Sequence, residues 1–255
     1  MVNTILRRCL LSVYYAEEFP NRKFASMEDV LYNPVYNALR TGDASLCFGT
    51  KEVKYFDEQV SPFAGFDWNY DEGFEDLYNL LPAGRNILYA TPQLINEPEG
   101  WQILTAIKGL QFVFDERTDP GYHSIKPEPL NNRNIGEMMQ LAALTKPGPF
   151  GPRTIEFGHY FGIFENKQLV AMTGQRLHVA NYTEISAVCT HPDHLGKGFA
   201  AALMLHQLSL IRSHGQMAYL HVREDNSRAI ALYERLGFKA RRTMNFYFMK
   251  RRAGK

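Results

Sequence analysis

The chain has 255 residues, 45% hydrophobic and 22% charged, and its 28 Lys and Arg against 27 Asp and Glu give a net charge of +1. At about 150 residues per domain, this length predicts one large domain or two modest ones. The near-neutral charge disfavours nucleic acid as a partner, because such binding depends on summed positive charge. The three cysteines lack CxxC spacing, which disfavours a disulfide framework and a thiolate zinc site and indicates a reducing compartment.

Residues 1–26 are predicted to form an N-terminal extension. Their short apolar run ends at Glu17 and Glu18 and lacks a small-residue cleavage site, so it matches a signal peptide poorly. No run approaches the roughly 18 consecutive apolar residues of a membrane helix, and we therefore expect no membrane partner and a cytoplasmic protein. Ser26 is a good helix N-cap, so the folded part is expected to begin near Met27.

Residues 27–120 show mixed helix and strand signals and are predicted to form an N-terminal α/β domain. Residues 87–91 and 110–114 read as buried strands, and residues 101–108 as a short helix or strand. A linker is expected at 119–121, where Pro and Gly follow each other.

Residues 121–255 alternate more clearly between strands and helices. Strands are predicted at 123–126, 160–164, 169–177, 184–190 and 218–222, helices at 135–144 and 198–213, and a last helix and strand follow. Gly215 and Gly237 are predicted to end the last two helices in a left-handed conformation. The order of these elements predicts an α/β (or α+β) fold.

A glycine turn after the strand at 184–190 is the first candidate binding site. Gly196 and Gly198 permit close approach of a ligand to the backbone, Ala200 keeps the first helical turn slim, and Lys197 adds a charge. The unpaired N–H groups and the dipole at the start of this helix favour a phosphate or pyrophosphate. The same pattern also occurs as a simple tight connection, and it lacks the full dinucleotide and P-loop motifs.

A second motif spans residues 226–238. Tyr233 shares the inward stripe of its predicted helix with Ala229, Leu232 and Leu236, which alone would indicate a core tyrosine. However, the pattern Asn-x-x-Ala-x-x-x-Tyr-x-x-x-Gly-Phe, 28 residues after the Gly-x-Gly-x-Ala turn, resembles the GNAT superfamily of N-acetyltransferases, and within it the FR47-like branch. The resemblance covers about residues 122–250.

The resemblance implies a GNAT fold, which is a mixed sheet with helices on both faces, and it implies acetyl-CoA as the acyl donor. The N-terminal α/β domain would then be a second domain, as a degenerate copy of the same fold. Donor-binding residues implied by the resemblance are Val188, Cys189 and Thr190 for the pantetheine and acetyl groups, the turn Leu195, Gly196, Lys197, Gly198, Phe199 and Ala200 for the pyrophosphate, and Asn226 for the pantetheine arm. Leu195 departs from the Gln or Arg of the family pattern, so binding would depend on backbone N–H groups, with Lys197 or His194.

Two residues carry the implied chemistry. Tyr233 would protonate the departing CoA thiolate. Glu184, 14 residues before Gly198, is our candidate for the base that removes a proton from the attacking ammonium, with a water chain as the alternative. Strand alternation puts Glu184, Ser186, Val188 and Thr190 on one face and Ile185, Ala187 and Cys189 on the other.

The expected activity is therefore transfer of an acetyl group to a primary amine by direct attack in a ternary complex. The alternatives are an amino-acid N-acyltransferase of the glycine N-acyltransferase type and a non-catalytic CoA-binding module. The acceptor is expected to be a small-molecule amine or a peptide amine, and a homodimer is one alternative for the assembly. No metal is expected, since the His-Pro-Asp-His sequence at 191–194 resembles the usual family turn.

Overall fold

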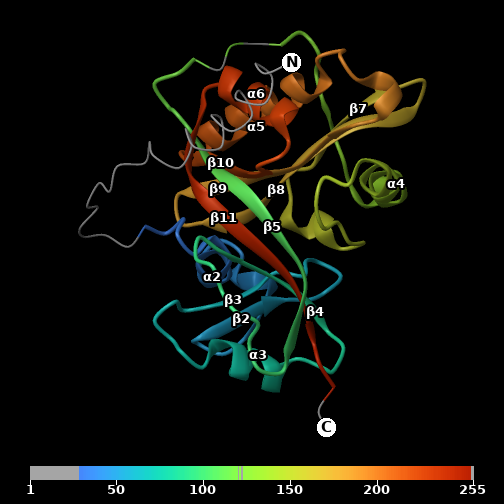
Figure 1. Cartoon of the computed structure of the whole chain (residues 1–255). Coiled ribbons are helices and arrows are strands. Elements are labelled where there is room, and N and C mark those ends of the chain that lie inside the picture. The colour runs from blue at the N-terminus through green and yellow to red at the C-terminus, as the bar shows by residue number, and fades with distance from the viewer. Residues whose placement is uncertain (1–28, 120, 122, 254–255) are drawn as a thin grey trace, which may run out of the picture.

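Two β-sheets organise the computed structural model, which describes residues 29–253 apart from 120 and 122. The extension predicted at 1–26, together with Ser26 and Met27, lies outside the described residues. A small antiparallel sheet has the order β1-β2-β3, from β1 (Cys47–Gly49), β2 (Val53–Phe56) and β3 (Ala64–Phe66). The larger sheet has eight strands. Most of them lie in the upper part of Figure 1, and β4, β5 and β11 extend into the lower part.

The eight strands of the large sheet are ordered β4-β11-β5-β10-β9-β8-β7-β6, and only β9 and β10 pair in parallel among the described strands. Their bounds are β4 Asn86–Thr91, β5 Trp101–Phe114, β6 Glu128–Pro129, β7 Phe161–Glu165, β8 Gln168–Val179, β9 Tyr182–Thr190, β10 Met217–Arg223 and β11 Phe238–Arg251. The helices are α2 Pro34–Arg40, α3 Gly73–Leu80, α4 Ile135–Thr145, α5 Phe199–Ser213 and α6 Ser227–Arg235, with 3-10 turns at Ala44–Leu46, Asn132–Asn134, Thr154–Phe157 and Pro192–His194.

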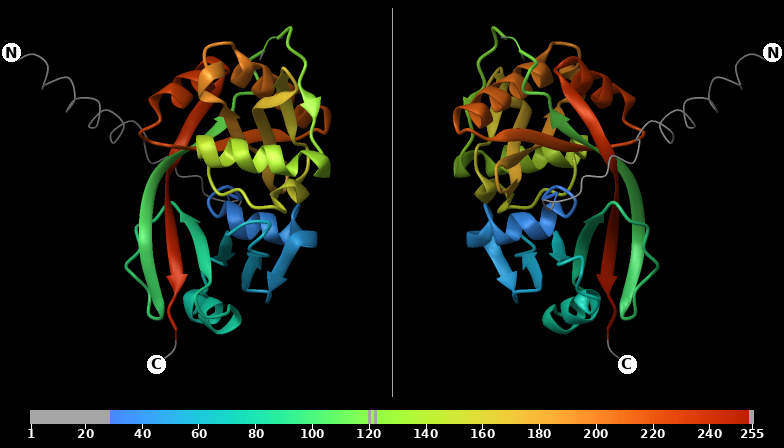
Figure 2. Two further views of the ribbon diagram at one scale, coloured as in Figure 1. Left: turned by 90° about the vertical axis from the view of Figure 1, so that its right-hand side faces the viewer. Right: turned by 90° about the vertical axis from the view of Figure 1, so that its left-hand side faces the viewer.

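Helices cover both faces of this sheet, as predicted. On one face, α5 and α6 pack through residues such as Met204 and Tyr233 on strand residues that include Ile185. On the other face, α2 and α4 pack on residues that include Leu177. Both views in Figure 2 show the helices on the two sides of the sheet. The architecture is therefore a mixed α/β sheet between helical layers.

The N-terminal region contributes two strands to this same sheet. Residues 101–108 and 110–114, treated separately in the sequence, form one strand, β5, which lies between β10 and β11. Gly109 in its middle lets Phe246 lie against the backbone, since a Cβ there would stand 3.0 Å from that ring and 2.9 Å from the Val222 oxygen. Strands from both sides of the boundary predicted near residue 120 therefore share one sheet, and Figure 1 shows the long β5 and β11 side by side in it.

Most predicted elements of the second region are confirmed with small shifts of their ends, including α4, β7 to β10 and α5. Gly215 and Gly237 have φ angles of 70° and 99°, the left-handed conformation that was predicted to end the helices. The strand predicted at 123–126 is wrong. The two-residue strand β6 at Glu128–Pro129 pairs with β7 instead.

A bulge in β9 overturns the predicted alternation of its side chains. Ala187 has a φ of 52°, and the register between β8 and β9 skips at this point. Ile185 and Val188 consequently pack toward the same helical layer, α5 and α6, whereas Ala187 and Cys189 join the opposite core. Strict alternation would have placed Val188 opposite Ile185.

Candidate functional site

The strands β9 and β10 separate after Glu184, before the bulge at Ala187, and open a cavity. Their parallel register runs from the pair Tyr182 and Met217 to the pair Glu184 and Tyr219. A cavity of about 1030 Å³ begins beyond this point, lined by the second half of β9, the end of β10, the glycine turn and the inner face of α6. The cavity reaches further to the N-terminal region, where Phe63 and Leu88 line it.

The glycine turn at the start of α5 has the geometry that suits a phosphate group. Gly196 and Gly198 have φ angles of 82° and 81°, a region that L side chains rarely adopt. A Cβ on Gly196 would meet nothing within 4 Å, so the turn is open on that side. Helix α5 begins at Phe199, and the first N–H groups of a helix have no partner within it. Backbone donors and the helix dipole therefore face an open part of the cavity, where an anion is favoured.

The side chains of this turn depart from the sequence-based expectation. Lys197 is not among the described residues that line the cavity, and its Nζ lies 2.6 Å from an oxygen of Glu165. His194 shares the same oxygen through its Nδ1, also at 2.6 Å. Leu195 lines the cavity with an apolar side chain that is 45% exposed. The turn thus offers backbone donors rather than a free lysine.

Four arginines that the motifs did not indicate line the cavity, and one of them, Arg176, lies on β8. Arg223 ends β10, while Arg228 and Arg235 lie on α6. The only signal in the sequence was the position of Arg228 two residues after Asn226, in the first turn of the predicted helix. Asn226 itself lines the cavity and also caps α6, because its Oδ1 accepts a hydrogen bond of 3.1 Å from the Ala229 N–H.

Tyr233 lies on the inner face of α6 and lines the cavity, as its helical position predicted. Among the described residues, its hydroxyl has no hydrogen-bond partner, and its side chain is largely buried. Burial, with a smaller contribution from neighbouring Cys189, raises the pKa of this tyrosine well above 10, so it is a protonated donor at neutral pH. Burial likewise raises the pKa of the Cys189 thiol to about 11, which disfavours a nucleophilic role for it.

Glu184 is held behind the cavity wall. Its carboxylate is fully buried and accepts hydrogen bonds from Arg176 Nε and Nη2 at 3.0 and 2.9 Å, and its Oε1 lies 2.9 Å from His221 Nδ1. Burial alone raises the pKa of this carboxyl, but the charges and hydrogen bonds of Arg176 and His221 outweigh burial and hold the pKa at about 2. Arg176 and His221 line the cavity, whereas Glu184 does not.

These three residues belong to a polar row that crosses four strands. Arg176 on β8 is opposite Glu184 on β9, and His221 on β10 is opposite Gln111 on β5. The Nε2 atom of Gln111 lies 3.1 Å from His221 Nε2, so both ring nitrogens of His221 have a neighbour. The row lies on the face of the sheet that carries α2 and α4.

Comparison with known proteins identifies the family. Residues 160–247 match the model of FR47-like proteins. A solved structure from Novosphingobium aromaticivorans, assigned to the GNAT family of acetyltransferases, is 30% identical, with a TM-score of 0.82 over 88% of this chain and 99% of that chain. The chain belongs to the GNAT family, in its FR47-like branch.

The GNAT assignment agrees with a more distant likeness. A GCN5-related N-acetyltransferase from Kribbella flavida shares the fold at 15% identity, with a TM-score of 0.58 over 88% of this chain and 96% of that chain. A search of the curated proteins found no match to this GNAT chain. In the part of the chain that the structure describes, no helix combines the length and apolar character needed to cross a membrane.

Proposed function

We propose that this GNAT protein is an acetyl-CoA-dependent N-acetyltransferase that acts on a primary amine by direct attack in a ternary complex. The observation that carries the proposal is the continuous cavity from the glycine turn, past Tyr233, to the apolar residues Phe246 and Phe248. One end has the donors for a phosphate-bearing ligand, the middle has a protonated acid, and the far end is open to a second molecule. Such an arrangement suits a donor and an acceptor bound together.

In this proposal, the pantetheine and acetyl groups pair with the main chain of Val188, Cys189 and Thr190, where β9 has left β10. The backbone N–H groups of residues 195–200 hold the pyrophosphate. Arg228 and Arg235 supply positive charge to the phosphate groups, whereas Lys197 is paired with Glu165 and Arg223 with Asp225. The apolar Leu195 predicts a modest affinity for CoA.

The transfer forms a C–N bond and breaks a C–S bond. The neutral amine attacks the thioester carbonyl, because only the unprotonated nitrogen has the required lone pair. A backbone N–H of β9 polarises the carbonyl oxygen, and the Tyr233 hydroxyl gives its proton to the departing thiolate. The products are an amide and CoA with a free thiol, and the proton of the acceptor ammonium leaves to a base.

Glu184 remains our candidate for proton removal, but it acts through His221. His221 lines the cavity and its Nδ1 lies 2.9 Å from this carboxylate, so a proton from the amine would reach Glu184 through the His221 ring. His221 Nε2 would have to exchange its contact with Gln111 for the amine. A water chain is the alternative route.

Calorimetric titration with acetyl-CoA and with CoA, followed by thiol release against a panel of amines, tests the proposal. Binding together with release for at least one amine supports the activity. Binding without release for any amine favours the non-catalytic CoA module, and no binding removes the proposed donor site. Faster release from benzoyl-CoA than from acetyl-CoA would favour the glycine N-acyltransferase type.

A further inference from the structure

At the end of the cavity away from the glycine turn, apolar side chains from the N-terminal region and β11 form an apolar wall. These residues are Phe63, Leu88, Ile107, Phe246 and Phe248. The wall stands directly on the polar row, because the Arg176 guanidinium carbon lies 5.1 Å from the centre of the Phe63 ring and the His221 ring lies 5.3 Å from that of Phe246. A ligand here would contact apolar rings on one side and charged groups on the other.

The charges that line the cavity have one sign. Its described lining residues include Lys146, Arg176, Arg223, Arg228 and Arg235, and no Asp or Glu. Arg223 is paired with Asp225, and Arg228 and Arg235 are assigned to the donor phosphates, so Lys146 and Arg176 are the lining cations left for the acceptor. A polyamine or a basic peptide would find no opposite charge there, since Glu184 is already bound to Arg176 and His221. The lining therefore favours an acceptor that carries negative charge as well as its amine.

Arg176 has donor capacity left for such a group. Its Nε and Nη2 atoms bind Glu184, whereas Nη1 has no hydrogen-bond partner among the described residues. Nη1 faces the loop at Gly148, where it lies 3.9 Å from the position that a Cβ would take. An arginine fork can hold a second carboxylate at this free nitrogen.

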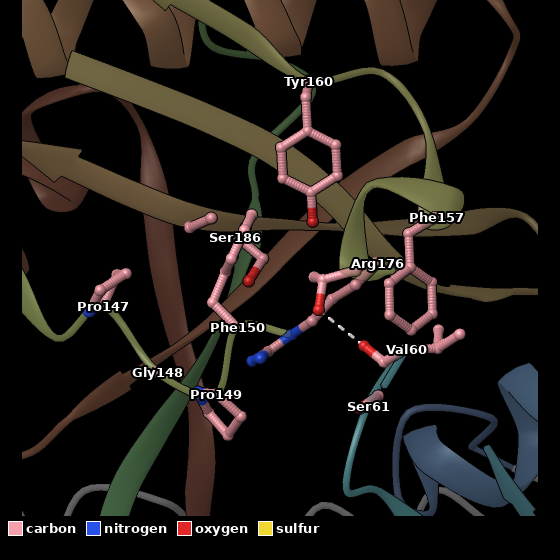
Figure 3. Close-up of a pocket in the computed structure, with 12 residues that line it drawn as sticks. Val60, Ser61, Pro147, Gly148, Pro149, Phe150, Phe157, Tyr160, Arg176 and Ser186 are labelled. Atoms are coloured by element: carbon pink, nitrogen blue, oxygen red, sulfur yellow. Dashed lines mark hydrogen bonds between the residues drawn. The ribbon is translucent and has the colours of Figure 1, made fainter. Parts of the chain in front are cut away.

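A small side chamber next to Arg176 supplies two more donors. Figure 3 shows the Tyr160 hydroxyl and the Ser186 side chain pointing into the space that Arg176 crosses. Tyr160 is 3% exposed, and its hydroxyl has no hydrogen-bond partner in the described part of the chain. Burial raises the pKa of Tyr160 well above 10, so its hydroxyl is a donor.

The size of this chamber limits what it can hold. Its volume of about 10 Å³ suits one water-sized atom. A single carboxylate oxygen fits this description, whereas a whole acceptor does not. Ser186, Ala187 and Arg176 line both the chamber and the main cavity, so an acid group can reach the chamber from the cavity. In an α-amino acid the amine is attached next to the carboxylate, which would place it beside the β9 bulge.

We propose that the acceptor is an apolar α-amino acid, with its carboxylate on Arg176, Tyr160 and Ser186 and its side chain against the apolar wall. This inference rests on the proposed acetyltransferase function and narrows its acceptor. Glycine has no side chain to contact the wall, and simple amines have no carboxylate for Arg176.

Matched pairs of acceptors test the inference through kcat/KM for thiol release from acetyl-CoA. The pairs are L-phenylalanine with phenethylamine and L-leucine with 3-methylbutylamine, and glycine is included. We expect the acid of each pair to exceed its amine by about 10- to 100-fold, which is the effect of a hydrogen bond to a charged group. L-Phenylalanine is expected to exceed glycine.

Two variants locate the effect. Tyr160→Phe removes one hydroxyl that has no hydrogen-bond partner among the described residues, so we expect the fold to be retained and the preference for the acid to fall several-fold. Arg176→Lys should abolish most of the preference, with Arg85→Lys as the matched control. Arg85 is also largely buried, and it is paired with Glu58 outside the cavity.

The outcomes separate the two proposals. Turnover of the simple amines at or above the rate of the amino acids overturns this inference and leaves the acetyltransferase function intact. Acetyl-CoA binding with no turnover of any amino acid also overturns it. Absence of acetyl-CoA binding overturns the proposed function itself. An acid preference that survives both Arg176→Lys and Tyr160→Phe places the carboxylate elsewhere and contradicts the assigned site.

Discussion

Arg176 and Glu184 face each other across β8 and β9 and are joined by two hydrogen bonds, at 3.0 and 2.9 Å, with the carboxylate fully buried. The pair stands in the wall of the cavity, where Arg176 is accessible and Glu184 is not. A buried ion pair contributes little net stability compared with apolar residues, but loss of one partner leaves an uncompensated charge. Loss of the Glu184 charge should therefore destabilise the fold and leave the charge of Arg176 in the cavity wall uncompensated.

Replacement of this carboxylate should destabilise the protein strongly at neutral pH. We expect Glu184→Gln to lower the free energy of unfolding by about 3–5 kcal/mol, measured by denaturant titration at pH 7. The folded pKa of about 2 lies below the ordinary 4.5, so the ionised carboxylate stabilises the fold at pH above 4.5. That stabilisation is lost as the pH falls from 4.5 toward 2, and the difference between variant and wild type should shrink over this range.

Glu156→Gln is the matched control for this variant, because Glu156 forms an exposed pair with Arg153. It should change stability by less than about 1 kcal/mol. A constant difference between Glu184→Gln and wild type from pH 7 to pH 2 would contradict this link between the Glu184 charge and stability. If Glu184 also takes part in proton removal, the pH–rate profile of the folded variant will shift, and an unaltered profile removes it from the reaction.

Local patterns predicted the glycine turn and the inward position of Tyr233, but not the cavity wall between them. The φ angles of Gly196 and Gly198 follow from their sequence positions, and Tyr233 faces inward because helical periodicity requires it. The partners of Glu184 depend on the register of β8, β9 and β10, which local patterns do not fix. The bulge at Ala187 changed which face each later residue of β9 occupies, and alternation alone cannot indicate it.

The N-terminal strands were hard to place for the same physical reason. Strand β5 pairs with β10 and β11, whose residues come more than 100 positions later, as with Gln111 and His221. A pairing over that separation leaves no local signal, so local patterns indicate that a segment is a strand but not which strands lie beside it. Local patterns likewise do not indicate that Phe63 and Leu88 line the cavity, because their neighbours there are distant in the sequence.

Removal of the Tyr233 hydroxyl tests the proposed acid. We expect Tyr233→Phe to lower kcat by about 100-fold or more, because proton transfer to the leaving thiolate is lost. Calorimetric affinity for CoA should stay unchanged, since the ring remains in the wall. Tyr182→Phe, at a tyrosine outside the cavity lining, is the control and should keep full turnover. Full turnover of Tyr233→Phe would show that another group protonates the thiolate.

Restoration of the family pattern at position 195 should improve donor binding. Leu195 is 45% exposed at the mouth of the glycine turn, so an arginine there has room to reach a phosphate. We expect Leu195→Arg to lower the Kd for CoA about two- to fivefold, the effect of one exposed charge pair, and to lose this gain at high salt. Leu94→Arg adds the same charge at an 80% exposed leucine away from the cavity. An equal gain in both variants would indicate general charge rather than a contact at the turn.

A comparison of alanine substitutions at Gly198 and Gly84 separates the cost of backbone strain from an effect of the glycine turn on CoA binding. Their φ angles are 81° and 79°, so an alanine at either position should cost about 1–2 kcal/mol of stability. The surroundings differ, since a Cβ at Gly84 meets nothing within 4 Å, whereas one at Gly198 stands 3.1 Å from His123 Nε2, beside the open N–H groups of α5. Gly198→Ala should therefore also weaken CoA binding in calorimetry, while Gly84→Ala leaves the affinity unchanged. Unaltered CoA affinity in Gly198→Ala would mean that the phosphates do not approach this turn.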